Sequence, residues 1–238
     1  MYSKKILLID EDSLFQKKTR QLFENAGAKV ISTCDAMEGI NNVLTQKPNL
    51  IILDIKISGN GGIQLCKTIR QFSNTPLIMV SALEKDQLWL DSLAAGADDF
   101  IIKPVNPEIL LARAMAVMRR SENSNGFHTL VDYDDGFLKI NIEKHRVFLK
   151  NKRVKLTPLE FRLLAYLVTN ADRVLSFEQI LDNVWGIEYK GNDEFVHVYI
   201  SHLRSKIEMD TKSPRYILSV HGVGYMFEKH VSAHAPSL

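Results

Sequence analysis

Short apolar runs alternate with longer amphipathic stretches through the first half of the chain. The runs consist mostly of Ile, Leu and Val, which is typical of strands buried on both faces of a parallel sheet. Between them, apolar residues recur at helical spacing. The pattern predicts strands at 5–9, 29–32, 49–54, 76–80 and 99–102, and helices at 14–26, 36–45, 63–72, 86–95 and 107–120. Five such units predict an α/β fold, a doubly wound five-stranded parallel sheet with helices on both faces.

The second half follows a different order, with short β-like segments first, then helices, then a hairpin. Each helix begins at a capping signal, a small polar residue just before an apolar periodic stretch. This order predicts a separate α+β domain. The predicted strands lie at 129–133, 137–142, 146–149 and 153–156, the helices follow the caps Thr157, Ser176 and Asn192 or Asp193, and the hairpin covers 216–227.

The third of these helices, at about 194–208, has two distinct faces. Apolar residues at i, i+4, i+7 and i+11 form one stripe, which we expect to face the core. Polar and basic side chains lie on another face. The stripe is Val196, Ile200, Leu203 and Ile207, and the other face carries His197, Ser201, Arg204 and Ser205.

Small polar residues at 121–126 separate the two halves and predict a short flexible linker. The predicted organisation is a first domain at 1–120, a linker at 121–128, a second domain at 129–229 and a disordered tail at 230–238. A chain of 238 residues has room for two domains of this size.

Composition narrows the function classes only slightly. The net charge is +2, with 15 Lys/Arg against 13 Asp/Glu in residues 1–120 and 15 against 14 in residues 127–238. Neither half is basic enough to indicate nucleic acid by charge alone. No apolar run is long enough to span a bilayer, and no signal peptide begins the chain, so we expect a cytoplasmic protein with no membrane partner. Cys34 and Cys66 are isolated, which predicts reduced thiols and no zinc site.

Charged and hydroxyl side chains follow the ends of several predicted strands of the first domain. Asp10 and Glu11 follow the first strand, Asp54 ends the third, Ser81 follows the fourth and Lys103 the fifth. The carboxyl ends of parallel strands share one crevice. Carboxylates converging there repel one another unless a cation lies between them, and an all-oxygen cluster suits Mg²⁺. A lysine and a hydroxyl suit a phosphoryl group, which Asp54 can accept as a carboxylate nucleophile.

These residues make 3–120 resemble the receiver domain of two-component response regulators. The resemblance implies phosphoryl transfer from a sensor histidine kinase to Asp54, with Mg²⁺ held by Asp10, Glu11, Asp54 and the main-chain carbonyl of Lys56. It also implies that Ser81 and the aromatic Phe100 move to report the phosphoryl group, and that the Lys103–Pro104 peptide bond is cis. The domain would be a phosphoryl acceptor with at most slow self-dephosphorylation, and not an enzyme.

Two departures from that family and one rival interpretation remain. Glu11 stands where Asp is more usual, and Lys56 places a cation at the lip of the site, where it would alter the lifetime of the phosphorylated form. The segment Asp10-Glu11-Asp12 also resembles the opening motif of haloacid-dehalogenase-type phosphatases, with Asp10 as nucleophile. That alternative leaves Asp54 and the whole second half unexplained.

The segments Leu156-Thr157-Pro158-Leu159-Glu160-Phe161 and Val220-His221-Gly222-Val223-Gly224-Tyr225 make residues 129–229 resemble the winged-helix domain of the OmpR/PhoB subfamily. The resemblance implies that the third helix enters the major groove of promoter DNA and the hairpin reaches the minor groove. Few arginines predict modest affinity, rising below about pH 6.5 as histidines gain charge. The DNA contacts expected are Phe195, His197, Val198, Tyr199, Ser201, His202, Arg204, Ser219 and His221.

The same family dimerises through the fourth helix, fifth strand and fifth helix of the receiver. By resemblance this face includes Trp89, Asp99, Ile109, Arg113 and Arg120, with Asp99 and Arg120 as a charge pair and Trp89 with Ile109 replacing another. The function implied is a response regulator that forms a homodimer on phosphorylation, binds promoter DNA and contacts RNA polymerase. The alternative is a phosphorylation-independent regulator whose receiver only dimerises.

Overall fold

The computed structural model describes residues 3–57, 61–83, 86–122, 132–186, 189 and 191–230. The chain divides into two compact units, Met1–Ser121 and Glu122–Leu238. Within the described ranges, no helix has both the length and the apolar character that crossing a membrane requires. The helix before the predicted linker continues to Glu122. The rest of that linker, the start of the first predicted strand of the second domain and nearly all of the predicted tail lie outside the described residues.

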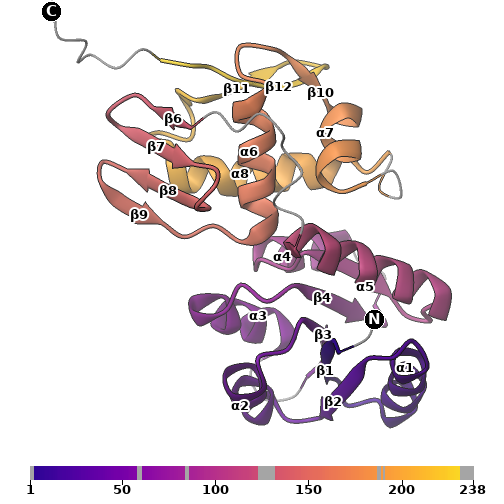
Figure 1. Cartoon of the computed structure of the whole chain (residues 1–238). Coiled ribbons are helices and arrows are strands. Elements are labelled where there is room, and N and C mark those ends of the chain that lie inside the picture. Colours follow the sequence, from indigo (N-terminus) through magenta and orange to yellow (C-terminus); the bar gives the residue numbers. More distant parts are fainter. Residues whose placement is uncertain are drawn as a thin grey trace, which may run out of the picture. The chain divides into compact units, whose positions relative to one another are not determined.

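The first unit is the predicted five-stranded parallel sheet, in the order β2-β1-β3-β4-β5 (Figure 1). Every strand of the prediction is present, with bounds shifted by at most two residues. The elements are β1 (Lys5–Ile9), α1 (Ser13–Asn25), β2 (Lys29–Thr33), α2 (Ala36–Gln46), β3 (Leu50–Asp54), α3 (Gly61–Phe72), β4 (Leu77–Ser81), α4 (Asp86–Ala94), β5 (Asp99–Ile102) and α5 (Pro107–Glu122).

Two apolar layers hold this sheet, one on each face. Alternate residues of β1 point to opposite faces, so that Leu7 and Ile9 lie in one cluster and Ile6 and Leu8 in the other. The first cluster contains residues of α2, α3 and α4, and the second contains residues of α1 and α5. Because both faces are covered, the strands must be apolar along their length, and polar chemistry is confined to their ends.

The described residues of the second unit form a four-stranded antiparallel sheet, three helices and a three-stranded sheet of order β10-β12-β11 (Figure 1). The fold class predicted for this half is confirmed. The elements are β6 (Tyr133–Asp134), β7 (Leu138–Asn141), β8 (Arg146–Leu149), β9 (Lys152–Val154), α6 (Pro158–Thr169), β10 (Leu175–Ser176), α7 (Phe177–Val184), α8 (Asp193–Ile207), β11 (Ile217–Val220) and β12 (Gly224–Phe227).

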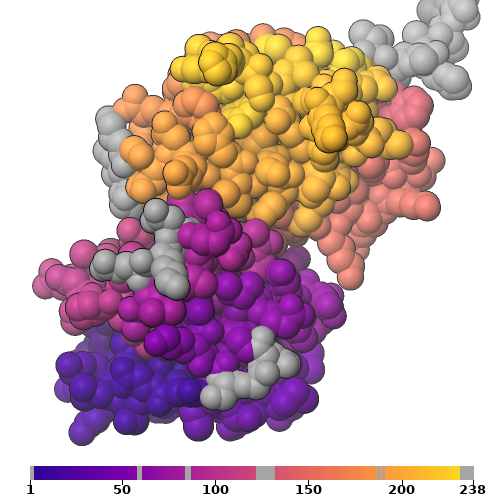
Figure 2. Space-filling model, turned by 180° about the vertical axis from the view of Figure 1, so that it is seen from behind, coloured from indigo at the N-terminus to yellow at the C-terminus, as the bar shows by residue number. Residues whose placement is uncertain are grey.

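Strand β10 was not expected from the sequence, because two residues are too few to show a pattern. It pairs with β12 through Leu175 and Tyr225. The pairing depends on Gly224, where an added Cβ would lie 2.0 Å from the Leu175 carbonyl oxygen. We call the β11–β12 hairpin with its turn at 221–223 the wing. The space-filling view in Figure 2 shows the yellow atoms of this C-terminal part of the chain at the surface of the second unit.

Both predicted capping boxes are present. The Thr157 hydroxyl accepts the Glu160 N–H at the start of α6, and Glu160 accepts the Thr157 N–H in return. Ser176 and Gln179 do the same for α7. Glu160 also accepts two contacts of 2.7 and 2.6 Å from the Lys206 ammonium on α8. The N-terminus of α6 is thereby joined to the last turn of α8.

Candidate functional site

The carboxyl ends of β1, β3 and β5 converge on one ammonium group. Lys103 Nζ donates to Asp10 Oδ2 and to Asp54 Oδ2, at 2.7 Å each. Asp10 is completely buried, and the Asp54 side chain is 10% exposed. We call Asp10, Asp54, Ser81 and Lys103 the phosphoryl site. The sequence prediction brought three of these side chains together correctly, and the Lys103–Pro104 bond is cis as expected.

Main-chain groups fix the second oxygen of each carboxylate. Asp54 Oδ1 accepts the Lys56 N–H at 2.9 Å, and Asp10 Oδ1 accepts the Asp12 N–H at 2.8 Å. The turn after β3 is further held by the Gly62 N–H, which donates to the Ile55 carbonyl at 2.8 Å. A Cβ at Gly62 would lie 2.2 Å from the Asp54 carbonyl oxygen. The start of α3 can therefore approach Asp54 only through glycine.

Electrostatics leave this site short of positive charge. Burial raises the pKa of Asp10 to about 6, with the Asp54 charge adding to that effect, although the hydrogen bond from Lys103 opposes it. Burial by itself would lower the pKa of Lys103, but its bonds to Asp10 and Asp54 outweigh burial and raise it. Two carboxylates share one ammonium, so one negative charge remains uncompensated. An added cation would relieve it.

Ser81 ends β4 and Phe100 lies on β5. Neither takes part in the contact of Lys103 with Asp10 and Asp54. The buried Ser81 hydroxyl bonds to the main chain of Leu83, accepting its N–H at 3.0 Å and donating to its carbonyl at 3.3 Å. Phe100 is 6% exposed and belongs to the apolar cluster beneath α4. Their predicted roles as reporting groups stay predictions.

Sequence reasoning missed two residues that support the site. The Phe15 ring lies 4.2 Å from Lys103 Nζ, a cation–π contact. The Gln16 amide donates to the carbonyls of Asp10 and Thr33, tying α1 to the ends of β1 and β2. The sequence did carry a signal for these two residues. Asp12 caps α1, so the first turn of that helix begins directly after Asp10 and Glu11.

In the second unit, side chains of α8 bond directly to the wing. Arg204 donates from Nε and Nη2 to the Ile217 carbonyl, at 3.0 and 2.6 Å, and from Nη2 to the Ser219 hydroxyl at 2.9 Å. His197 Nδ1 lies 2.8 Å from the Tyr225 hydroxyl. The exposed face of α8 and the hairpin therefore form one surface.

The end of α8 is also bonded to the start of β11. The Glu208 carboxylate accepts three consecutive main-chain N–H groups, from Arg215 at 2.8 Å, Tyr216 at 2.9 Å and Ile217 at 2.8 Å. A buried carboxylate with three such donors is well satisfied. It fixes the direction in which the chain enters the hairpin.

Comparisons with known proteins agree with the domain type expected for each half of the chain. Residues 6–115 match the model of the response regulator receiver domain, and residues 151–227 match the model of the C-terminal domain of transcriptional regulatory proteins. The alkaline phosphatase synthesis transcriptional regulatory protein PhoP of Bacillus subtilis is 35% identical over 95% of this chain and 98% of its own length. The chain belongs to the OmpR/PhoB family of response regulators.

Solved structures show the same relationship for this response regulator. The OmpR/PhoB homologue DrrB of Thermotoga maritima is 33% identical, with a TM-score of 0.50, and the match covers 95% of this chain and 99% of that one. A mutant of the protein RitR is 26% identical, with a TM-score of 0.79, covering 96% and 100%. Receiver and DNA-binding domain together identify a two-component response regulator that acts as a transcription factor, and its matched relatives are transcriptional regulators.

Two of the predicted DNA contacts of the response regulator are wrong. Phe195 and Tyr199 are 3% and 1% exposed. Both rings pack against Trp185, at centroid distances of 6.1 and 5.2 Å. They lie one position before Val196 and Ile200 on the helix, so they widen the apolar stripe and belong to the core.

The other predicted DNA residues differ in how far they are available. His197, Ser201, Ser219 and His221 are exposed, and Val198 is partly buried. Arg204 is partly buried and bonded to the wing. His202 is partly buried, and burial lowers its pKa. It therefore gains charge at lower pH than the sequence led us to expect.

The residues of the predicted dimer face differ in how far they are exposed within one chain. Asp99 is completely buried and accepts a 3.0 Å hydrogen bond from Arg113 of its own chain, and Arg120 is also buried. Neither Asp99 nor Arg120 is thus an exposed charge. Trp89 packs partly against the receiver core, whereas Ile109 is 50% exposed. The dimer itself stays a prediction.

The Mg²⁺ prediction is compatible with the donor set but lacks a complete ligand group. Among the described residues, no three His, Cys, Asp or Glu side chains are grouped so that they could hold a metal ion. Glu11 is exposed and does not complete such a group with Asp10 and Asp54. The two converging carboxylates and their uncompensated charge fit a hard divalent cation.

Proposed function

We propose that this response regulator accepts a phosphoryl group on Asp54 from a sensor histidine kinase. The observation that carries the proposal is the shared contact of Lys103 Nζ with Asp10 and Asp54, at 2.7 Å each. It places a carboxylate, a cation and a second acid at one crevice. In the transfer, an Asp54 oxygen forms the new P–O bond while the P–N bond of the phosphohistidine breaks.

Each neighbouring group has a defined task in that step. Lys103 stays beside Asp54 and balances the charge of the incoming phosphoryl oxygens. Asp10, Asp54 and the Lys56 carbonyl would hold Mg²⁺, which supplies further neutralisation of phosphoryl charge when bound, and the exposed Glu11 would join them only by turning toward the site. The Ser81 hydroxyl exchanges its bond to Leu83 for a phosphoryl oxygen, and Phe100 follows that shift.

The output is a homodimer that binds promoter DNA. The fourth helix, fifth strand and fifth helix of the receiver form the dimer face, and Ile102, Ile109 and Met115 are exposed apolar residues on these elements. The winged helix binds DNA through the exposed face of α8 and the wing, and the bound dimer contacts RNA polymerase. The residues that remain candidates for DNA contact are His197, Val198, Ser201, His202, Arg204, Ser219 and His221.

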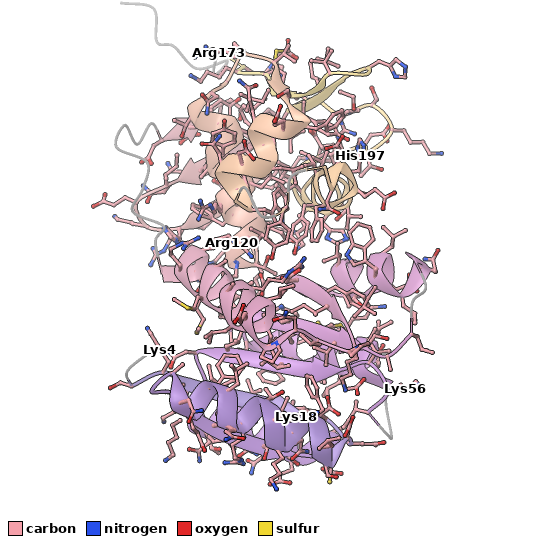
Figure 3. All side chains as sticks on the ribbon, turned by 90° about the vertical axis from the view of Figure 1, so that its right-hand side faces the viewer. Lys4, Lys18, Lys56, Arg120, Arg173 and His197 are labelled. Atoms are coloured by element: carbon pink, nitrogen blue, oxygen red, sulfur yellow. The ribbon has the colours of Figure 1, made fainter. Side chains whose placement is uncertain are left out.

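Lys56 sets the lifetime of the phosphorylated form, which otherwise decays by slow self-dephosphorylation. Its N–H holds Asp54 while its side chain is exposed at the end of β3, where Figure 3 labels it. An ammonium there screens the phosphoryl group from water. Dephosphorylation of Lys56→Ala, followed after removal of the donor, is expected to be a few-fold faster, and an unchanged rate would remove Lys56 from this role.

The deciding experiment is incubation with Mg²⁺ and acetyl phosphate or phosphoramidate, followed by intact mass and oligomeric state. A phosphate-sized mass gain that is absent from Asp54→Ala and present in Glu24→Ala, an exposed acidic control on α1, is expected together with dimerisation. Absence of any gain would favour the phosphorylation-independent regulator. A label mapped to Asp10 would instead favour the phosphatase-like alternative.

A further inference from the structure

The imidazole of His197 is held by two aromatic side chains from other elements. Its Nδ1 lies 2.8 Å from the Tyr225 hydroxyl on β12. Phe177, the first residue of α7, makes an edge contact with a centroid distance of 4.9 Å. The side chain is nevertheless exposed, and Figure 3 labels it on α8. One ring nitrogen is thus engaged inside the protein, and Nε2 is left for an outside ligand.

The direction of the hydrogen bond between Tyr225 and His197 decides which ring nitrogen carries the proton. A neutral imidazole has one donor and one acceptor nitrogen, whereas a phenol can do both. Among the described residues the Tyr225 hydroxyl has no hydrogen-bond partner besides His197. Within the protein it can therefore use its proton only by donating to Nδ1. Nδ1 is then the acceptor, and the imidazole proton lies on Nε2.

Neighbouring groups favour the same assignment. The Tyr225 ring is buried, and burial raises the pKa of its hydroxyl more than the nearby Arg204 guanidinium lowers it. The hydroxyl therefore keeps its proton at neutral pH. The Arg204 guanidinium lies 5.5 Å from the Tyr225 ring centroid and supplies no acceptor that could compete for that proton.

We propose that Tyr225 fixes His197 in the Nε2–H tautomer, so that α8 presents a preset hydrogen-bond donor to an acceptor atom on DNA. The choice of DNA as the ligand rests on the proposed DNA-binding function, whereas the tautomer of His197 does not. The acceptors available are guanine N7 and O6, adenine N7, thymine O4 and phosphate oxygens. The exocyclic amines of cytosine and adenine are donors and are rejected. Tyr225 is then a positioning residue for specificity.

The tautomer is tested directly by nitrogen NMR of the full chain with ¹⁵N-labelled histidine. The His197 signals are identified by their loss in His197→Gln. In the parent we expect Nε2 to be protonated and Nδ1 bare, and in Tyr225→Phe we expect a mixture of tautomers. Tyr133→Phe is the matched control, because that hydroxyl accepts the His230 N–H and does not contact His197. A protonated Nδ1 in the parent, or identical signals in Tyr225→Phe, would overturn the proposal.

The ligand is tested by selecting duplexes from a randomised pool with each variant. We expect one position to prefer an acceptor-bearing base in the parent and in His197→Gln, which keeps a donor, and to lose that preference in His197→Ala and Tyr225→Phe. Loss of the donor should weaken binding to the selected duplex about 3- to 10-fold. The same base preferences together with the same duplex affinity in the parent and in His197→Ala would overturn the DNA part of the proposal.

Modified duplexes separate the two sources of the acceptor. If a base is read, 7-deazaguanine or a base lacking the keto oxygen at that position should abolish the difference between the parent and His197→Ala. If a phosphate is read, a methylphosphonate should do so and no base preference should depend on His197. A parent that selects no duplex would refute the proposed function and the ligand, while the NMR result would still decide the tautomer.

Discussion

At the scale of single residues, Gly62 shows how little space surrounds the phosphoryl site. A methyl group there would meet the Asp54 carbonyl at 2.2 Å and the Ile55 Cα at 2.7 Å, and both are main-chain atoms that cannot turn away. Side chains that crowd a site can move, but crowded main chain must shift as a whole.

Gly62→Ala should therefore displace Asp54 as well as cost about 1–3 kcal/mol of unfolding free energy. We expect phosphoryl uptake from acetyl phosphate to fall at least several-fold. Gly61→Ala is the control, because Gly61 has a positive φ of 64° but nothing within 4 Å of an added Cβ. An alanine at this positive φ is strained and should lower the free energy of unfolding, while phosphoryl uptake is retained. Equal uptake by both variants would contradict this account of Gly62.

His202 gives the second unit a pH dependence whose sign can be worked out. Burial lowers its pKa below the ordinary 6.5, with Lys206 adding to that effect and Glu160 opposing it. The unfolded chain then binds the proton more readily than the folded one. The stability contributed by neutral His202 is present above pH 6.5 and is lost as pH falls below that value.

Thermal unfolding of the full chain at pH 7.5 and pH 5.5 should show this loss. We expect the Tm of the second unit to fall less in His202→Gln than in the parent between these two conditions. His221→Gln removes an exposed histidine of the wing turn and serves as the control. A Tm difference equal in all three proteins would show that His202 does not titrate in this way.

At the scale of elements, most of the fold could be predicted because each element carries its own signal. Apolar runs such as 5–9 and capping residues such as Thr157 specify strands and helix starts locally. The boundaries differ by a residue or two because frayed ends depend on tertiary contacts. Strand β10 and the contact of Tyr225 with α8 were not predictable, since they form only when distant segments meet. For Phe15, the Asp12 cap was a usable local signal that sequence reasoning did not follow.

The errors on α8 have a related cause. The period of the helix identified the stripe of Val196 and Ile200 but not its width. Phe195 and Tyr199 are core residues because Trp185, from the segment after α7, covers that side of the helix. Width depends on how many neighbours pack around a helix, and the sequence of the helix alone does not contain that number.

The capping box of α6 yields a prediction at this scale. Thr157→Ala should lower the unfolding free energy of the second unit by about 1 kcal/mol, because the Glu160 N–H loses its partner. Ser176→Ala removes the same kind of cap from the more exposed start of α7 and should cost less. The chain has two tryptophans, so Trp185 fluorescence in a Trp89→Phe background reports on this unit alone. A larger loss in Ser176→Ala would contradict the expectation.

At the scale of the whole molecule, the proposed dimer depends on exposed apolar surface. Ile109 is 50% exposed on α5, whereas Trp89 is partly packed into the receiver core. Ile109→Glu should therefore weaken phosphorylation-dependent dimerisation at least several-fold without lowering receiver stability, because a charge is driven into an apolar contact. Sedimentation of phosphorylated parent and variant measures this. Met37→Glu, at a 67% exposed residue of α2, is the control.

Dimerisation of Ile109→Glu equal to that of Met37→Glu would place the dimer face elsewhere. Trp89→Ala is a poorer test of the dimer face than Ile109→Glu, since loss of the core packing of Trp89 would also destabilise the receiver.

The bonds of Glu208 and Arg204 to the strand that follows α8 also limit how this protein can be redesigned. A chimera that received a relative's helix together with its C-cap position would lose both side chains that orient the hairpin wherever the relative carries other residues at 204 and 208. Three main-chain N–H groups would be left without their carboxylate. To retarget this regulator to another promoter, the graft should therefore run without interruption from Asp193 to Phe227, with helix and hairpin exchanged as a single cassette.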